Sequence, residues 1–174
     1  LEDMGCEVIR ISPDENGEIN ARDIFAAVNE DTFLVSCMLV NNENGYILPV
    51  EKAFSMIKKK YPQVLTHCDC VQGFMKIPVK AKKLNADMIS LSGHKIYAPK
   101  GIGALYVKKG VHIPPFMLGG GQEKGFRSGT ESVPLICGFG AAVKKLAPNV
   151  SANFEKAADI QAYLIEKCNE NGDV

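Results

Sequence analysis

A lysine and an aspartate each follow an apolar run of this sequence. Lys95 comes shortly after the run at 86–92, and Asp69 ends the run at 63–68. Both runs have the composition of buried strands, and the ligand sites of open α/β sheets lie at the carboxyl ends of strands. An amine and a carboxylate in such places are the pair that a pyridoxal phosphate (PLP) site requires. The amine forms a Schiff base with the cofactor, and the acid faces its pyridinium nitrogen.

Further polar residues surround this pair. Ser92 and His94 flank the lysine, and a hydroxyl and an imidazole can both donate to phosphate oxygens. Gln72 follows Asp69 by three positions and can donate to a phenolate oxygen without adding charge. Each residue alone also has an ordinary interpretation, such as a surface lysine or a core histidine. The functional interpretation rests on their combination.

The order of five motifs indicates a family. The chain resembles the middle of a cysteine desulfurase, in the class V aminotransferase group, over essentially its whole length. The motifs that carry this resemblance lie at 41–45, 67–72, 92–95, 99–107 and 119–130.

The resemblance implies a role for each candidate residue near the lysine. Lys95 would be the catalytic lysine that bonds PLP and later moves protons on the substrate carbon. Asp69 would hold the pyridine nitrogen protonated, and Gln72 would contact the ring hydroxyl. Ser92 and His94 would bind the phosphate.

Two further residues complete the site that the resemblance implies. Asn42, at the end of the apolar run 32–40, would lie on the hydroxyl side of the ring, although it also sits in an excellent turn sequence. Thr130 ends a segment with five glycines, 119–130, which would cross a homodimer interface so that the threonine reaches the phosphate of the partner subunit. The ordinary alternative for this segment is a flexible surface loop.

The implied reaction is removal of sulfur from L-cysteine, which leaves L-alanine and an enzyme-bound persulfide. The implied recipient is a sulfur acceptor such as an iron–sulfur scaffold protein or a tRNA-modifying enzyme. None of the six cysteines matches the nucleophile of the family. We therefore expect the chain to be a fragment that lacks the nucleophilic loop and has little or no activity alone.

Several alternatives stay open or fall away on the sequence. Another class V PLP enzyme, such as a selenocysteine lyase or an aminotransferase, is the nearest alternative, and a non-catalytic remnant of the fold is another. Ser92 and Lys95 also match a serine–lysine pattern of penicillin-binding enzymes, but the companion Ser-Asp-Asn and Lys-Thr-Gly motifs do not occur. We expect no metal site, because consecutive strand residues such as His67 and Cys68 face opposite ways.

Charge and cysteine content restrict the partners and the compartment. The 20 basic and 20 acidic residues balance, so no long-range field favours nucleic acid or a membrane surface. No apolar run is long enough to span a bilayer. The cysteines lie in or beside apolar segments, which predicts reduced, buried thiols in a cytoplasm.

The alternation of elements predicts an α/β fold: a mostly parallel sheet with flanking helices. By resemblance it would be part of the large PLP-binding domain of a fold type I transferase. We expect 1–147 to be a partial large domain, and 148–174 to be a linker and a helix leading toward a small domain. Strands are predicted at 6–11, 32–40, 64–68, 87–91 and 103–107, and helices at 21–29, 50–60, 132–146 and 153–170.

Overall fold

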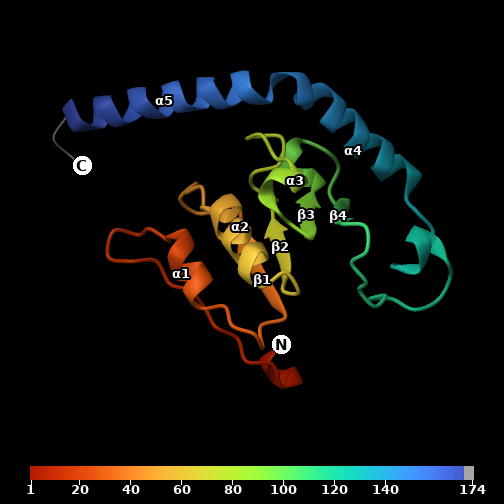
Figure 1. The fold of residues 1–174 in the computed structure, drawn as a ribbon. Helices are drawn as coiled ribbons and strands as arrows, with labels where there is room; N and C mark the ends of the chain where they lie inside the picture. Colours follow the sequence, from red (N-terminus) through yellow and green to blue (C-terminus); the bar gives the residue numbers. More distant parts are fainter. Residues whose placement is uncertain (171–174) are drawn as a thin grey trace. The chain divides into compact units, whose positions relative to one another are not determined.

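The structure, a computed structural model, describes residues 1–170, which form two compact units. The first unit consists of Leu1–Gln72, Lys80–Leu91 and Ala104–Ile113. The second consists of Gly73–Val79, Ser92–Gly103 and the chain from Pro114 on. Figure 1 shows the order of the elements along the chain.

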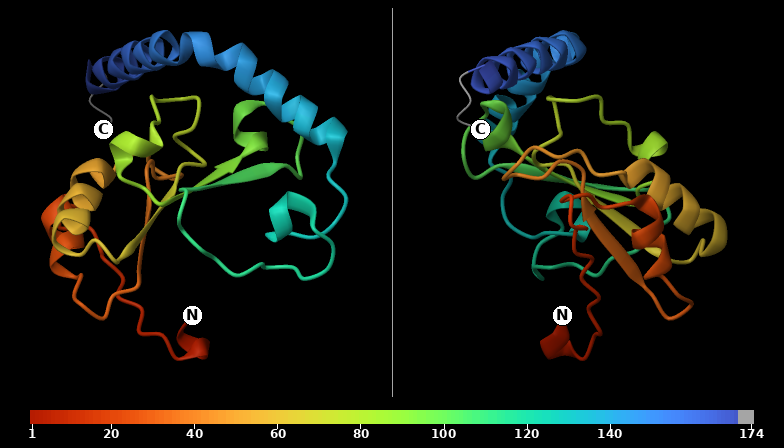
Figure 2. Two further views of the ribbon diagram at one scale, coloured as in Figure 1. Left: turned by 45° about the vertical axis from the view of Figure 1, so that its right-hand side comes forward. Right: turned by 90° about the vertical axis from the view of Figure 1, so that its left-hand side faces the viewer.

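A four-stranded sheet forms the centre of the first unit (Figure 2). Its order is β1-β2-β3-β4, and both β1–β2 and β2–β3 are parallel. In the register, Asp69 lies opposite Ser90. The predicted α/β fold with a mostly parallel sheet is confirmed. The strands are β1 (Leu34–Met38), β2 (Leu65–Asp69), β3 (Met88–Ser92) and β4 (Gly103–Val107).

Helices connect the parallel strands, as the crossover between two parallel strands requires. They are α1 (Ala21–Ala26) before β1, α2 (Val50–Lys60) between β1 and β2, and α3 (Ala81–Leu84) between β2 and β3. The bounds of α2 match the prediction. Its residues Val50, Ala53, Phe54 and Ile57 are 0% exposed, and their spacing places them on one helix face. This face forms the core of the unit.

One charged residue lies in this core. Asp87, 3% exposed, comes directly before β3 and accepts hydrogen bonds from the Thr66 amide (3.0 Å) and hydroxyl (3.1 Å). Lys58 of α2 and Lys108, which follows β4, form ion pairs with it. Burial raises the pKa of Asp87, but these hydrogen bonds and charges outweigh burial and hold the pKa below its usual value. The carboxylate thus joins α2, β2, β3 and β4.

The predicted strand at 6–11 is extended but unpaired, so this prediction was wrong. It follows a short 3₁₀ turn, Glu2–Met4. A strand requires a neighbour that pairs with its backbone groups. Among the described residues, no backbone hydrogen bond joins this segment to the sheet. The segment, α1 and β1 together line a cavity of about 830 Å³.

The second unit contains two long helices, α4 (Val133–Leu146) and α5 (Val150–Glu170). The linker predicted around Pro148 is a 3₁₀ turn, Ala147–Asn149, that joins them. Proline is tolerated there because the first turn of a helix has no partner for its N–H group. The domain boundary at 147/148 stays a prediction.

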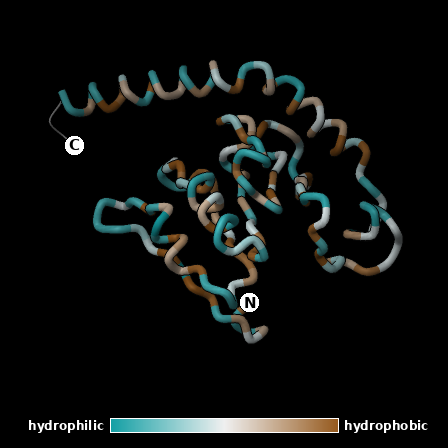
Figure 3. Tube along the Cα trace, in the orientation of Figure 1, coloured by the Kyte–Doolittle hydropathy of each residue, from teal (hydrophilic) through white to brown (hydrophobic). Residues whose placement is uncertain are grey.

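The apolar stripe predicted for α5 is present and exposed. Along α5, hydrophobic and hydrophilic residues alternate in Figure 3. Phe154 is 41% exposed and Leu164 is 61% exposed. Within residues 1–170, no helix is both long and apolar enough to cross a membrane.

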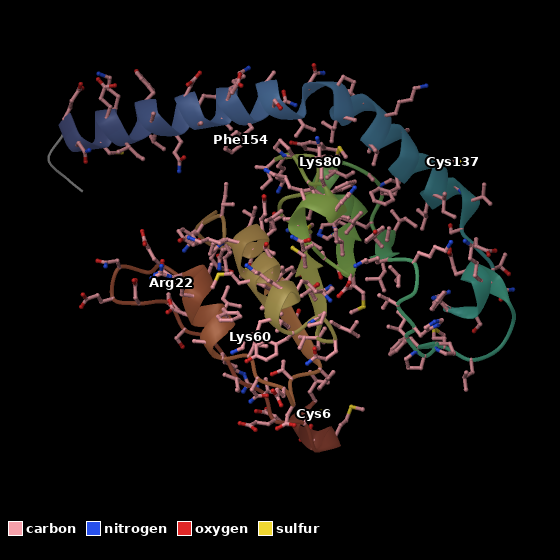
Figure 4. The ribbon with its side chains drawn as sticks, in the orientation of Figure 1. Cys6, Arg22, Lys60, Lys80, Cys137 and Phe154 are labelled. Carbon is pink, nitrogen blue, oxygen red and sulfur yellow. The ribbon has the colours of Figure 1, made fainter. Side chains whose placement is uncertain are left out.

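The cysteines are free thiols, but they are not uniformly buried. Cys68 and Cys70 are buried, and their sulfur atoms lie 3.4 Å apart. Cys137, labelled on α4 in Figure 4, is exposed, which contradicts the prediction of buried thiols at this position. Helix α4 has no fully buried residue among those described, although Gly138 and Ala142 are half-buried.

Candidate active site

Lys95 lies in a tight 3₁₀ turn, Gly93–Ile96, that follows β3 directly. Gly93 makes this turn possible, since a Cβ there would come within 2.7 Å of Ile102 Cγ2. Its amide donates to the Ile102 carbonyl at 2.9 Å, and Ile96 is 1% exposed and anchors the turn. Tyr97 ends the turn with φ 63°, in the left-handed region. The local sequence therefore fixes the backbone that carries the lysine.

The two predicted phosphate-binding residues lie together beside this lysine. Ser92 Oγ and His94 Nδ1 share a hydrogen bond of 2.7 Å. His94 is exposed, and Lys95 is half-buried. A hydroxyl and an imidazole in contact can donate to the same anionic group.

Lys76 belongs to the surroundings of Lys95, and sequence reasoning missed it. It is an exposed residue overall, yet partial burial lowers its pKa, and the positive charge of Lys95 lowers it further.

Helix α4 packs against both segments of the second unit that carry these lysines, Gly73–Val79 and Ser92–Gly103. Phe74 packs edge-on against Phe139 at 6.3 Å, and Pro99 lies against Gly138 so closely that a Cβ there would be 2.8 Å from Pro99 Cδ.

Asp69 is the last residue of β2, and its side chain is half-buried. Its Oδ1 accepts a hydrogen bond of 2.8 Å from the Val71 amide, which fixes the carboxylate against the turn that follows the strand. Gln72 lies in this turn and is also half-buried. The predicted strand-end position of the acid is confirmed.

A histidine two residues before Asp69 forms a polar ladder across three strands. His67 Nδ1 bonds Ser36 Oγ of β1 at 2.8 Å, and His67 Nε2 bonds Ser90 Oγ of β3 at 2.7 Å. Partial burial lowers the pKa of His67, and the charge of Asp69 opposes this effect. The ladder joins the centres of β1 and of the two strands that end at Asp69 and Ser92. The sequence feature that could have indicated this ladder is one polar residue within each of three apolar runs, namely Ser36, His67 and Ser90.

The remaining predicted residues lie in turns and loops. Asn42 is exposed after β1, and its amide donates to Glu43 Oε1 at 2.7 Å, within the turn that its sequence predicted. Thr130 is exposed in the second unit, at the end of the glycine-rich segment. Gln122 Oε1 accepts a bond from the Gly129 amide at 3.2 Å, so the segment has internal structure. The predicted reach of Thr130 into a partner subunit stays a prediction.

The donor set fits PLP. Ser92 ends β3, His94 and Lys95 follow it, and the Asp69 carboxylate ends the neighbouring strand β2. The Ser92–His94 pair offers donors suited to a phosphate group, and the fixed Asp69 carboxylate suits a pyridinium nitrogen. Among the described residues, no three His, Cys, Asp or Glu side chains converge as a metal site would require.

Curated proteins similar to this chain are cysteine desulfurases. A cysteine desulfurase of Nostoc sp. is 38% identical over 100% of this chain and 45% of that protein. A mitochondrial cysteine desulfurase of Arthroderma benhamiae is 46% identical over 95% of this chain and 33% of that protein. The chain thus spans less than half the length of these relatives.

Solved structures agree in fold. A NifS-like protein matches with a TM-score of 0.90 and 39% identity, over 97% of this chain and 46% of that chain. A structure of SspA in complex with cysteine matches with a TM-score of 0.79 and 39% identity, over 91% of this chain and 46% of that chain. These likenesses support the predicted type I fold of PLP-dependent enzymes.

The family model for aminotransferase class-V matches residues 1–174. Enzymes of this family, cysteine desulfurases among them, generally depend on PLP. With the strand-end lysine, its Ser92–His94 pair and the Asp69 carboxylate, this match leads to one assignment: the chain belongs to the aminotransferase class-V family.

Proposed function

We propose that these 174 residues are the PLP-binding part of a cysteine desulfurase, which takes sulfur from L-cysteine and leaves L-alanine. The observation that carries the proposal is the turn after β3, which presents Lys95 beside the bonded Ser92–His94 pair. The names of the relatives, and the cysteine complex of the similar protein SspA, support L-cysteine as substrate.

Four residues of the chain would make the main contacts with the cofactor. Lys95 would bond it covalently, Ser92 and His94 would donate to its phosphate, and Asp69 would face its pyridine nitrogen. Three further residues would complete the contacts: Asn42, Gln72 and Thr130. Thr130 would act across a homodimer, on the cofactor of the partner subunit.

Bound PLP would supply an electron sink for the α-carbon of the substrate. The contribution of the chain is placement and proton control. The Asp69 carboxylate would face the cofactor nitrogen and favour its protonated form. Lys95 Nζ would hold a proton close to the α-carbon of the substrate. Gln72 would bind the ring hydroxyl side without adding charge.

The sulfur-accepting group would come from outside these residues. Cys68 and Cys70 are buried in the sheet, while Cys137 and Cys168 lie on helices α4 and α5. None of these four occupies a loop that could approach a substrate and withdraw. Of the other two, Cys37 lies in β1, and the half-buried Cys6 follows the Glu2–Met4 turn. The 174-residue chain alone should therefore form little or no alanine from L-cysteine, and sustained alanine formation would contradict this. A sulfur acceptor protein, such as an iron–sulfur scaffold, belongs to the same proposal.

A competition experiment tests the substrate class. The chain is loaded with PLP, exposed to L-cysteine, D-cysteine or L-alanine, and reduced with borohydride, which makes the bond between cofactor and amine permanent. The amine of either enantiomer can compete with Lys95 for the cofactor, but a formed substrate site favours one of them. We therefore expect L-cysteine to lower cofactor labelling at Lys95 more than D-cysteine does. A Lys100→Arg variant is the matched control, since Lys100 is an exposed lysine of the same segment.

The outcomes separate the alternatives. Equal displacement by both enantiomers of cysteine would show that no substrate site is formed, which contradicts the proposal. Displacement by L-alanine in preference to L-cysteine would favour an aminotransferase instead.

A further inference from the structure

One face of the parallel sheet carries His67, Asp69 and two serines. Successive residues of a strand face opposite sides, so His67 and Asp69, two positions apart in β2, lie on the same face. The register places Ser36 of β1 beside His67, and Ser90 of β3 beside Asp69. The face that presents the candidate cofactor acid is therefore polar around the centre of β2.

Both nitrogens of the His67 ring are occupied by hydroxyl groups. Nδ1 shares a hydrogen bond of 2.8 Å with Ser36 Oγ, and Nε2 shares one of 2.7 Å with Ser90 Oγ. A neutral imidazole has one donor and one acceptor nitrogen, and a hydroxyl can fill either role, so the two serines satisfy the neutral ring. Partial burial disfavours the charged form and lowers the pKa of His67. The ladder therefore holds a neutral imidazole.

The carboxylate beside this ring is a competing partner for it. Asp69 is the one carboxylate within the described strands β1, β2 and β3, and its charge opposes the effect of burial on the pKa of His67. An imidazolium that donates to a carboxylate forms a stronger bond than two neutral groups do. Without the serines, the His67 ring would gain most by turning to Asp69 as a cation. That ion pair would neutralise the acid that a pyridinium nitrogen requires.

We propose that His67 is a positioning residue of the cofactor site, which Ser36 and Ser90 hold as a neutral ring so that the Asp69 carboxylate stays available to the pyridine nitrogen of PLP. The inference rests on the proposed function, in which Asp69 faces that nitrogen. His67 acts on the cofactor through Asp69. The two side chains are fixed separately, because Asp69 Oδ1 accepts from the Val71 amide at 2.8 Å while the ring bonds across the strands.

Removal of the two hydroxyls tests this inference in the chain without PLP. In a Ser36→Ala, Ser90→Ala double variant, an NMR titration of the imidazole nitrogens measures the pKa of His67. We expect this pKa to rise by about one unit or more, because the freed ring gains from pairing with Asp69. Addition of Asp69→Asn should abolish the rise. A Ser36→Thr, Ser90→Thr variant keeps both hydroxyls and should keep the original pKa, as should Ser55→Ala, at an exposed serine of α2.

A second measurement observes the cofactor itself. PLP that is isotopically labelled at its ring nitrogen is fixed to Lys95 with borohydride, and the chemical shift of this nitrogen reports its protonation. We expect the nitrogen to keep its proton at neutral pH in the original chain and in the double threonine variant. In the double alanine variant it should lose the proton at a pH lower by about one unit or more, because His67 then compensates the charge of Asp69. A change in packing alone would not produce this shift.

Three results would overturn the proposal: an unchanged pKa of His67 in the double alanine variant, a rise that persists with Asp69→Asn, or a ring nitrogen that titrates alike in all variants. If circular dichroism shows that the double alanine variant does not fold, the single variants Ser36→Ala and Ser90→Ala serve the same test, since each frees one ring nitrogen. Absence of label at Lys95 in the original chain would count against the proposed function instead. The first titration contains no PLP and would still decide whether the serines keep His67 from Asp69.

Discussion

Replacement of Asp87 should cost the first unit much of its stability. The carboxylate is 3% exposed, accepts two hydrogen bonds from Thr66, and pairs with Lys58 and Lys108. Removing one partner of a buried ion pair costs about 3–5 kcal/mol, because the other charges and donors lose their compensation. We therefore expect Asp87→Ala to lower the free energy of unfolding by about 3–5 kcal/mol.

Urea unfolding followed by circular dichroism measures this loss. Asp87→Asn is the informative second variant, since it keeps the shape and can still accept from Thr66. It should lose less than the alanine variant. Glu51→Gln is the matched control, because Glu51 pairs with Lys83 at 3.2 Å while both side chains are exposed. Such surface pairs contribute about 0–1 kcal/mol. A loss below about 1 kcal/mol for Asp87→Ala would show that its buried ion pairs stabilise the fold no more than surface pairs do.

The same residue predicts a pH dependence. The pKa of Asp87 in the folded chain lies below its usual value, so the unfolded chain binds this proton more readily. The stabilisation is therefore complete above the ordinary aspartate pKa of about 3.9 and is lost as the pH falls through the folded value. The stability difference between the original chain and Asp87→Asn should shrink below about pH 4. A difference that stays constant into acid would contradict the linkage.

Three further predictions follow from burial. In the native chain, Cys137 should react with iodoacetamide first because it is exposed, while the buried Cys68 and Cys70 should react only after unfolding. Mass spectrometry of partly labelled peptides checks this order. Early labelling of Cys68 would contradict it. Phe54→Ala should lower the free energy of unfolding by about 3–5 kcal/mol, since the ring is 0% exposed, with Phe116→Ala, at a residue 93% exposed, as its control in urea unfolding. In an NMR titration, His67 should have a pKa below the usual histidine value, because partial burial lowers it. The contribution of His67 to stability is then present at neutral pH and lost as the pH falls. A raised pKa of His67 would contradict the effect of burial.

The parts of the fold that the sequence predicted well are those with a complete local pattern. Val50, Ala53, Phe54 and Ile57 mark one helix face, and α2 has the predicted bounds. β4 likewise has its predicted bounds at 103–107. In both cases, the apolar pattern and its flanking residues lie within one short stretch of chain.

The errors arose where the outcome depends on a distant neighbour. Residues 6–11 have the composition of a strand, but pairing requires a second chain segment beside them, which local composition does not reveal. The sequence predicted a linker at Pro148 and a helix from residue 153, but α5 begins already at Val150, because proline is tolerated where a helix begins. The ladder of Ser36, His67 and Ser90 depends on the register of three strands, so it became visible only in the structure.

The candidate site divides in the same way. Lys95, Ser92 and His94 are adjacent in sequence, and their placement in one turn could be predicted. Asp69 could be placed at a strand end from its apolar run. Lys76 could not be connected with Lys95 from the sequence, because helix α4 supports the two segments that carry them.

Cofactor trapping without substrate shows directly whether Lys95 is the lysine that binds PLP. The chain is incubated with PLP, reduced with borohydride, digested, and mapped by mass spectrometry, alongside Lys95→Arg and Lys100→Arg variants. We expect one label per chain, at Lys95, which Lys95→Arg abolishes and Lys100→Arg leaves unchanged. Labelling scattered over exposed lysines, or unchanged in Lys95→Arg, would contradict the assignment of Lys95 as the cofactor-binding lysine.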